Sequence, residues 1–122
     1  MPRTRVVFYR DEHGNAPVLA WLDRLSAKAQ DRCRVTIERL RELGFELRRS
    51  EADFLRDGIY ELRVRLQRVN YRILYFFHRD IAAVLAHGLV KEKQIPASDI
   101  DRAVRRKEKF AQNPTAHTYA EA

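Results

Sequence analysis

The sequence predicts an α+β protein in which a small, mainly antiparallel sheet carries a helical hairpin on one face and a C-terminal helix. Three observations support this fold class. The hydrophobic pattern has helical spacing between Pro17 and Leu43, alternates with a period of two after Gly58, and returns to helical spacing after Pro96. The chain has 122 residues, of which 45% are hydrophobic, so its size and composition suit one domain with a single core.

The first part of the chain is expected to form a strand followed by two helices. Residues 5–9 are a short apolar segment typical of a strand. Pro17 suits the first position of a helix. A second helix is expected from Lys28 to about Leu43, because Ser26 is a good N-cap and Gly44 can end the helix with a positive φ. The inner faces of the two helices would consist of Val18, Leu19, Trp21, Leu22 and Leu25, and of Ala29, Cys33, Ile37, Leu40 and Leu43.

Three strands are expected after a loop of mixed charge between Phe45 and Arg56. The first strand follows Gly58 and ends at Leu66, the second covers Val69 to Phe77, and the third covers about Ile81 to Val90. Short separations between these segments indicate antiparallel neighbours.

The last element is expected to be a helix from Ser98 to about Phe110. Ser98 would be its N-cap, and Asp101 would occupy the capping-box position. Its inner edge would consist of Ile100, Ala103, Val104, Lys107 and Phe110 or Ala111. Residues 112–122, which include Pro114, are expected to form a flexible tail outside a single domain of residues 1–111. The order of elements is therefore β-α-α-β-β-β-α.

The hairpin from Tyr60 to Phe77 is the most informative segment. A two-residue turn at Gln67-Arg68 would pair Leu66 with Val69 and Arg63 with Arg72. One face, which must pack on the core, would hold Tyr60, Leu62, Val64, Leu66, Val69, Tyr71, Ile73 and Tyr75. The other face would hold Arg63, Arg65, Asn70 and Arg72 near the turn, with Glu61, Leu74 and Phe76 further along.

The arginines on this second face allow two interpretations. Like charges on adjacent sheet positions repel one another, so the cluster does not serve stability. An RNA phosphate between the arginines would receive bidentate, charge-assisted hydrogen bonds. The alternative is a solvated strand face on which Glu61 neutralises one arginine.

The chain is strongly basic, with a formal net charge of +7 and a pI of about 10.0, and this favours a polyanionic partner such as nucleic acid. The excess is concentrated in the second half, where 13 Lys and Arg stand against 7 Asp and Glu between Arg56 and Lys109. One cysteine, Cys33, fits a reducing compartment. No apolar run reaches membrane-spanning length and no secretion signal is visible at the start, so a cytoplasmic location without membrane contact is expected.

Between about Phe54 and Phe110 the chain resembles the RelE/ParE toxins, and within them the HigB-like, phage-derived branch of type II toxin–antitoxin systems. The resemblance also includes Pro96 before the last helix. The segments that carry it are Phe54-Leu55-Arg56-Asp57-Gly58-Ile59-Tyr60-Glu61-Leu62-Arg63, Tyr71-Arg72-Ile73-Leu74-Tyr75-Phe76-Phe77 and Leu85-Ala86-His87-Gly88-Leu89-Val90-Lys91-Glu92-Lys93.

The resemblance implies a metal-independent endoribonuclease that cleaves mRNA, typically in the ribosomal A site. It also implies a cognate antitoxin, for which a helix-turn-helix protein is expected. Arg72 matches the arginine that members place on the scissile phosphate, and Arg63 lies where RelE-type enzymes carry basic active-site residues. Lys91 and Lys93 fall in the family's basic segment after the last strand, and Lys91 is expected to assist catalysis. The residues expected to bind RNA beside these are Arg65, Asn70 and Lys93.

The chain departs from the RelE pattern in one respect, because no tyrosine lies between Phe77 and Phe110, where members carry a catalytic one. His87 is the histidine inside the matched segment, and an ordinary pKa of roughly 6.5 suits proton transfer. A neutral histidine packed at a strand end is an equally open interpretation of this residue.

No metal or cofactor is expected, because the phosphate-binding glycine loop and zinc-ligand spacing are absent; the four histidines are His13, His78, His87 and His117. Besides the endoribonuclease, two other functions share such a fold: a ParE-like, noncatalytic inhibitor of DNA gyrase, and a noncatalytic RNA-binding module. The basic residues Arg63, Arg65, Arg72 and Lys91 favour cleavage.

Overall fold

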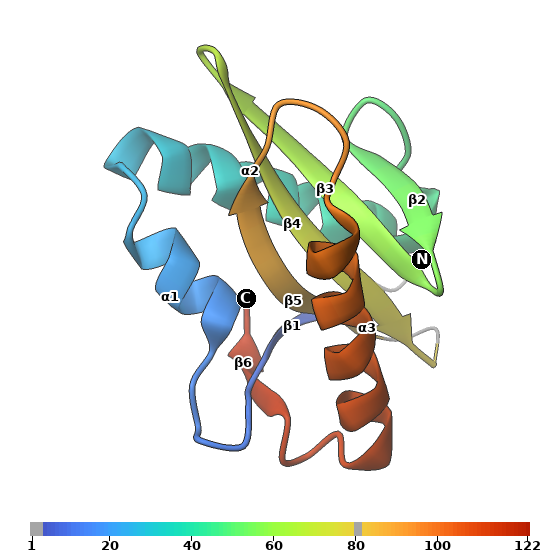
Figure 1. The fold of residues 1–122 in the computed structure, drawn as a ribbon. Helices are drawn as coiled ribbons and strands as arrows, with labels where there is room; N and C mark the ends of the chain where they lie inside the picture. Colours follow the sequence, from blue (N-terminus) through green and yellow to red (C-terminus); the bar gives the residue numbers. More distant parts are fainter. Residues whose placement is uncertain (1–3, 80–81) are drawn as a thin grey trace.

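The computed structural model describes residues 4–79 and 82–122. Within these residues, six strands form one sheet in the order β2-β3-β4-β5-β1-β6, with β1 parallel to β5 and the other neighbours antiparallel (Figure 1). The strands are β1 (Arg5–Tyr9), β2 (Ala52–Arg56), β3 (Ile59–Leu66), β4 (Val69–His78), β5 (Ala82–Val90) and β6 (Thr118–Glu121). The helices are α1 (Pro17–Asp23), α2 (Ala27–Leu43), the short 3-10 turn η1 (Gly44–Glu46) and α3 (Ala97–Gln112).

Helices cover both faces of the sheet, and each face has its own apolar core. The hairpin of α1 and α2 packs on one face, and α3 packs on the other, across β3, β4 and β5. The first core includes Leu22, Leu40, Leu62, Ile73 and Leu85. The second core, under α3, includes Ile59, Leu74, Phe76, Ile100 and Phe110. The predicted α+β class and its helical hairpin are therefore confirmed.

The second helix of the hairpin, α2, begins and ends as the sequence predicts. The Ser26 hydroxyl accepts a hydrogen bond from the backbone N–H of Ala29 at 3.2 Å. Gly44 has a φ of 55° and donates its N–H to the carbonyl of Leu40, which closes the last turn of α2. Cys33 is fully buried and burial raises the pKa of its thiol to about 11, so it behaves as a core residue.

The hairpin of β3 and β4 has the predicted register. Leu66 pairs with Val69 and Arg63 pairs with Arg72, and Gln67 at the turn has a φ of 58°. Of the residues expected in the core on one face, Leu62, Val64, Ile73 and Tyr75 are buried there, with Tyr60 and Tyr71 packed against them. Leu66 is only half-buried and Val69 is exposed, because both lie at the turn, at the end of the hairpin. The expected third strand is β5, and its predicted first residue, Ile81, lies outside the described residues.

Two boundaries differ from the prediction. The expected loop before Gly58 contains β2, an edge strand in which Phe54 pairs with Tyr60 of β3. Helix α3 begins at Ala97 with Pro96 as N-cap, so Ser98 and Asp101 lie inside the helix and do not cap it. The cause is local: Pro96 is already extended at ψ 143°, and its carbonyl accepts hydrogen bonds from the backbone N–H groups of Asp99 and Ile100.

The segment expected to be a flexible tail instead contains β6, which pairs with β1 at the edge of the sheet. The carbonyl of His117 accepts a hydrogen bond from the Arg10 N–H at 2.8 Å, and Nδ1 of the same histidine donates to the Arg10 carbonyl at 2.7 Å. The His117 ring is buried and stacks on Tyr9 at 5.2 Å, with 3° between the ring planes. The segment is polar, which predicts a tail, but the ring stacking and the strand pairing hold it against β1.

Removal of residues 113–122 should therefore destabilise the protein. The loss includes one stacked ring pair and several hydrogen bonds on β1, so the free energy of unfolding should fall by at least about 2 kcal/mol. Urea denaturation measures this change. The single variant His117→Ala, which lacks the stacked ring, should show part of the same loss of stability. A truncated protein as stable as the full chain would contradict the prediction.

Candidate functional site

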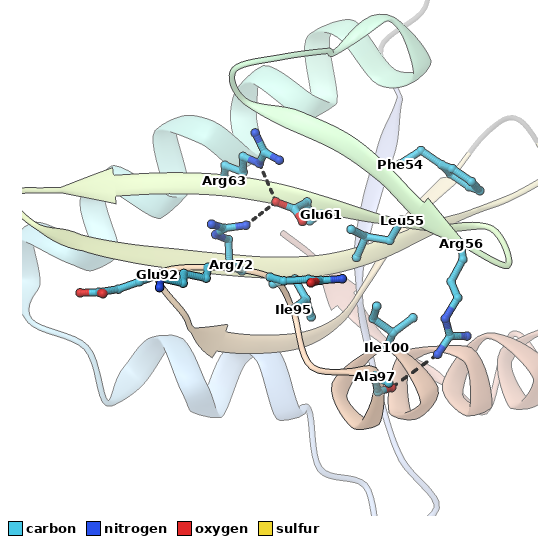
Figure 2. Close-up of a pocket in the computed structure, with 12 residues that line it drawn as sticks. Phe54, Leu55, Arg56, Glu61, Arg63, Arg72, Glu92, Ile95, Ala97 and Ile100 are labelled. Atoms are coloured by element: carbon cyan, nitrogen blue, oxygen red, sulfur yellow. Dashed lines mark hydrogen bonds and ion pairs between the residues drawn. The ribbon is translucent and has the colours of Figure 1, made fainter.

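A cavity of about 620 Å³ opens on the α3 side of the sheet (Figure 2). Its walls come from β2, from β3 and β4, and from the segment that leads from β5 into the first turn of α3. The lining residues include the charged side chains of Arg56, Glu61, Arg63, Arg72, Glu92 and Lys93. An apolar wall is formed by Phe54, Leu55, Ile95, Ala97 and Ile100.

The carboxylate of Glu61 holds two arginines together at one side of this cavity. Its Oε1 accepts hydrogen bonds from Nε of Arg63 at 2.6 Å and from Nη1 of Arg72 at 2.5 Å (Figure 2). Glu61 and Arg63 are two positions apart on β3, and Arg72 is the cross-strand partner of Arg63 on β4. Strand alternation and register therefore place all three side chains on one face of the sheet.

This cluster is largely removed from solvent. Glu61 is 3% exposed, and the side chain of Arg72 is 12% exposed. Arg63 is more open, and its Nη2 also lies 3.5 Å from Oδ2 of Asp53 on β2. The hydrogen bond to Glu61 raises the pKa of Arg63 above its ordinary value. The interpretation in which Glu61 neutralises arginine is thus confirmed in part, and the carboxylate serves two arginines instead of one.

The arrangement presents guanidinium groups to whatever occupies the cavity. A guanidinium has five N–H donors, and the hydrogen bonds to Glu61 use one nitrogen atom of Arg72 and one of Arg63. The remaining donors match the oxygens of a phosphate or carboxylate. Because Glu61 restrains both side chains, these donors are oriented before a ligand arrives.

The opposite wall offers apolar surface next to this charge. Leu55, Ile95 and Ile100 line the cavity, and Phe54 at its margin is 53% exposed. Phe54 contacts the ring of Tyr60 edge-on at 5.2 Å. A ligand that combines an anionic group with a flat apolar ring would contact both walls.

The other predicted site residues are divided between this cavity and a second one. Lys93 lines the first cavity. Arg65 and Asn70 line a neighbouring cavity of about 440 Å³, which shares Arg63 and Arg72 with the first. Lys91 is exposed at the end of β5, where its backbone N–H donates to the Asn70 carbonyl at 3.1 Å. Five of the predicted residues thus surround one pair of cavities, and Lys91 lies beside them.

His87 lies under α3 and not among the residues that line these cavities. Its Nε2 is 2.7 Å from Oδ1 of Asp99 in the first turn of α3, and its side chain is 12% exposed. Arg106 on the same helix donates to the Ala86 carbonyl at 2.6 Å and lies 3.5 Å from Nδ1 of His87. Burial lowers the pKa of His87 below its ordinary value. This environment favours the interpretation of His87 as a packed histidine that ties α3 to β5.

Sequence reasoning missed the central place of Glu61 and the presence of Phe54 in the site. The first could have been found, because the predicted register already placed Glu61 beside Arg63 and diagonal to Arg72. The second could not, because it depends on β2, which lies where no strand was expected.

Among residues 4–79 and 82–122, no three His, Cys, Asp or Glu side chains form a group that could hold a metal ion. No helix in the same residues is both long enough and apolar enough to cross a membrane.

Comparison with known proteins gives one family. Residues 20–108, which include α2, β2 to β5 and most of α3, match the family described as phage derived protein Gp49-like (DUF891). No curated protein matches the chain.

Replacement of the bridging carboxylate should be costly. In Glu61→Gln the two arginines lose their counter-charge in a buried position, so the free energy of unfolding should fall by about 3 kcal/mol. The matched control is Glu51→Gln, which breaks the more exposed ion pair with Arg39 and should cost much less. Urea denaturation measures both. Inorganic phosphate should restore part of the stability of Glu61→Gln, and equal losses in the two variants would contradict this account of the site.

The buried state of His87 should appear as a pH dependence of stability. The pKa of His87 is lower in the folded protein than the ordinary 6.5 of the unfolded chain. The unfolded chain therefore takes up the proton first, so this contribution is complete above pH 6.5 and is lost as the pH falls below it.

Wild-type protein should consequently lose stability relative to His87→Gln when the pH is lowered from about 7.5 to about 5.5. Denaturation curves at each pH measure this difference, and the exposed His13→Gln is the control. A constant difference between wild type and His87→Gln would show that His87 is not held neutral by burial.

Proposed function

The chain belongs to the phage-derived Gp49-like family, whose members are toxins of the RelE and HigB type, and from this premise we propose that it is a metal-independent endoribonuclease that cleaves mRNA. The toxin would act on the ribosome and would be neutralised by a cognate antitoxin. The observation that carries the proposal is the pair of guanidinium groups of Arg63 and Arg72, which Glu61 orients at the edge of a cavity large enough for a nucleotide.

The cavity suits a nucleotide in two respects. The phosphate would lie against the free N–H groups of Arg63 and Arg72, where charge-assisted hydrogen bonds are strong. The base would lie against the apolar wall, where the exposed ring of Phe54 offers a surface for stacking. Lys93, at the margin of the same cavity, would contact the next phosphate of the chain.

The reaction that we propose needs no activated water. The 2′-oxygen of the ribose forms a bond to the adjacent phosphorus, and the bond from phosphorus to the 5′-oxygen breaks. The proton of the 2′-hydroxyl passes to a base, for which Glu61 is the candidate in the cavity, and the 5′-oxygen takes up a proton from solvent water as it leaves. The arginines stabilise the negative charge that accumulates on the phosphoryl oxygens, which is the largest contribution in many enzymes.

The predicted site residues divide into three roles in this proposal: binding of the scissile phosphate, binding of the rest of the strand, and attachment of α3. Arg72 and Arg63 bind the scissile phosphate, and Arg65 and Asn70 bind the strand where it passes into the neighbouring cavity. Lys91 adds positive charge beside them. We assign His87 to the attachment of α3, because its ring nitrogens face Asp99 and Arg106.

An antitoxin is the partner that this family implies. We propose that it covers the cavity or places an acidic side chain against Arg63, because either contact would exclude the phosphate of the substrate. The +7 charge of the toxin would accelerate association with an acidic partner.

The direct test is cleavage of mRNA by purified protein, with and without EDTA. Arg72→Ala and Arg72→Lys should each lower the cleavage rate by at least about a hundredfold, because lysine keeps the charge but lacks the two-pronged donor geometry. Arg34→Gln, on the exposed side of α2, is the control and should retain activity. Wild-type activity should survive EDTA and leave a 2′,3′-cyclic phosphate or 3′-phosphate, with a 5′-hydroxyl on the other fragment.

Three results would refute parts of this proposal. Products with a 5′-phosphate, or activity that disappears with EDTA and returns with magnesium, would refute the mechanism. Full activity in folded Arg72→Lys would refute the site. Growth inhibition without any RNA cleavage, together with inhibition of DNA gyrase, would favour the ParE-like alternative.

A further inference from the structure

Helix α3 carries a second group of cations, away from the cavity described above. Arg102, Arg105, Arg106 and Lys109 follow one another at the spacing of a single helix face, and we call them the α3 stripe. They line a separate hollow of about 230 Å³ together with Tyr9, Asp11 and Glu12, at the end of β1. The first turn of α3 contributes Ala97 and Ile100 to the larger cavity.

The two sites lie on opposite flanks of the helix. With 3.6 residues in each turn, the α3 stripe points away from the side on which Ala97 and Ile100 lie. Figure 1 shows β2, which borders the larger cavity, and the loop after β1, which borders the stripe, on opposite sides of α3. A ligand bound at one site therefore does not occupy the other.

The α3 stripe is only partly neutralised. Lys109 forms an ion pair with Glu12 at 2.5 Å. The carboxylate of Asp11 accepts hydrogen bonds from the backbone N–H groups of His13 and Asn15 in its own loop. Within residues 4–79 and 82–122, no carboxylate lies within ion-pair distance of the guanidinium groups that remain, which belong to Arg102, Arg105 and Arg106.

Arg106 lines this hollow, and two contacts hold its side chain in place. It donates to the Ala86 carbonyl at 2.6 Å, and its guanidinium carbon lies 5.8 Å from the centre of the Tyr9 ring. Burial and the neighbouring charge of Arg102 lower the pKa of Arg106 below its ordinary value. Like charges at this spacing on a helix destabilise it, and a bound anion would remove that repulsion.

We propose that the α3 stripe binds the phosphodiester backbone of a nucleic acid, at a site distinct from the cavity around Glu61. A protein partner would need apolar anchors at the centre of its contact. The exposed large apolar side chains of the described residues are Val35, Phe45, Phe54, Val69, Val90 and Tyr119, and none of them lines this hollow. Backbone phosphates need only well-placed cations.

The site would contact only backbone phosphates, so it would position the protein on the nucleic acid without any preference for base sequence. Arg102 and Arg105 are exposed and free to form bidentate hydrogen bonds with phosphate oxygens. Together with the larger cavity, the stripe allows the protein to hold two separate segments of nucleic acid, one on each flank of α3. The inference does not depend on cleavage, because it concerns binding alone.

The test measures binding of the full chain as a function of salt concentration. The variant is Arg102→Gln with Arg105→Gln, and the control is Lys28→Gln with Arg34→Gln on α2, which removes the same charge from exposed positions. One probe is a 2′-O-methyl RNA strand, which cannot react through its 2′-oxygen, and the other is a DNA duplex of the same sequence.

For the single strand, each lost phosphate contact should reduce the steepness of the plot of log binding constant against log salt concentration by about 0.7. The stripe variant loses two contacts, so its slope should be less steep by about 1.4 than that of the wild type. Its affinity should fall about tenfold, and the control should change little. Comparison of the two probes identifies which nucleic acid supplies the backbone. Among residues 4–79 and 82–122 no ion pair holds Arg102 or Arg105, so circular dichroism should show an unchanged fold.

Two outcomes would overturn the proposal. In one, the stripe variant and the α2 control lose the same affinity and the same slope, so that only net charge matters. In the other, both variants bind the probes as the wild type does, and the stripe variant alone loses affinity for the antitoxin, which would make the stripe a protein contact. Cleavage activity decides neither outcome, so failure here is distinguishable from failure of the proposed function.

Discussion

The bridge from Glu61 to Arg63 and Arg72 is the interaction on which the site depends. Two guanidinium groups on neighbouring strands would repel each other, and the repulsion would be severe where Arg72 is largely buried. One carboxylate between them allows the sheet to form with both cations in place. The same carboxylate orients the cations, so the group that makes the fold tolerate the charge also prepares it for an anionic ligand.

The hairpin of β3 and β4 is the part of the protein that its sequence predicts best. Near the turn its apolar and charged residues alternate over two strands, and this register places Leu62, Val64 and Ile73 on one face and the arginines on the other. That register positions Arg63 opposite Arg72 without any knowledge of the rest of the chain. The helical hairpin is equally well determined, because Ser26 and Gly44 mark its boundaries by local hydrogen bonding.

The missed features depend on contacts between distant segments. Strand β2 has no alternating pattern of its own and forms because β3 offers an unpaired edge. Strand β6 follows a polar segment, and its position depends on the His117 ring against Tyr9, far away in sequence. The surroundings of His87 are of the same kind, since its partners Asp99 and Arg106 lie on a helix that begins later in the chain.

The position of β1 has a consequence for how the protein can be made. Although β1 is the first strand in the sequence, both of its neighbours in the sheet, β5 and β6, come from the last third of the chain. During synthesis the N-terminal strand must therefore wait, unpaired, until those segments have left the ribosome. The contacts that complete the sheet are among the longest in sequence, which predicts slow final assembly. For a proposed nuclease of RNA this order is protective, because an incomplete chain that is still attached to its own message has no finished sheet on which to hold a substrate.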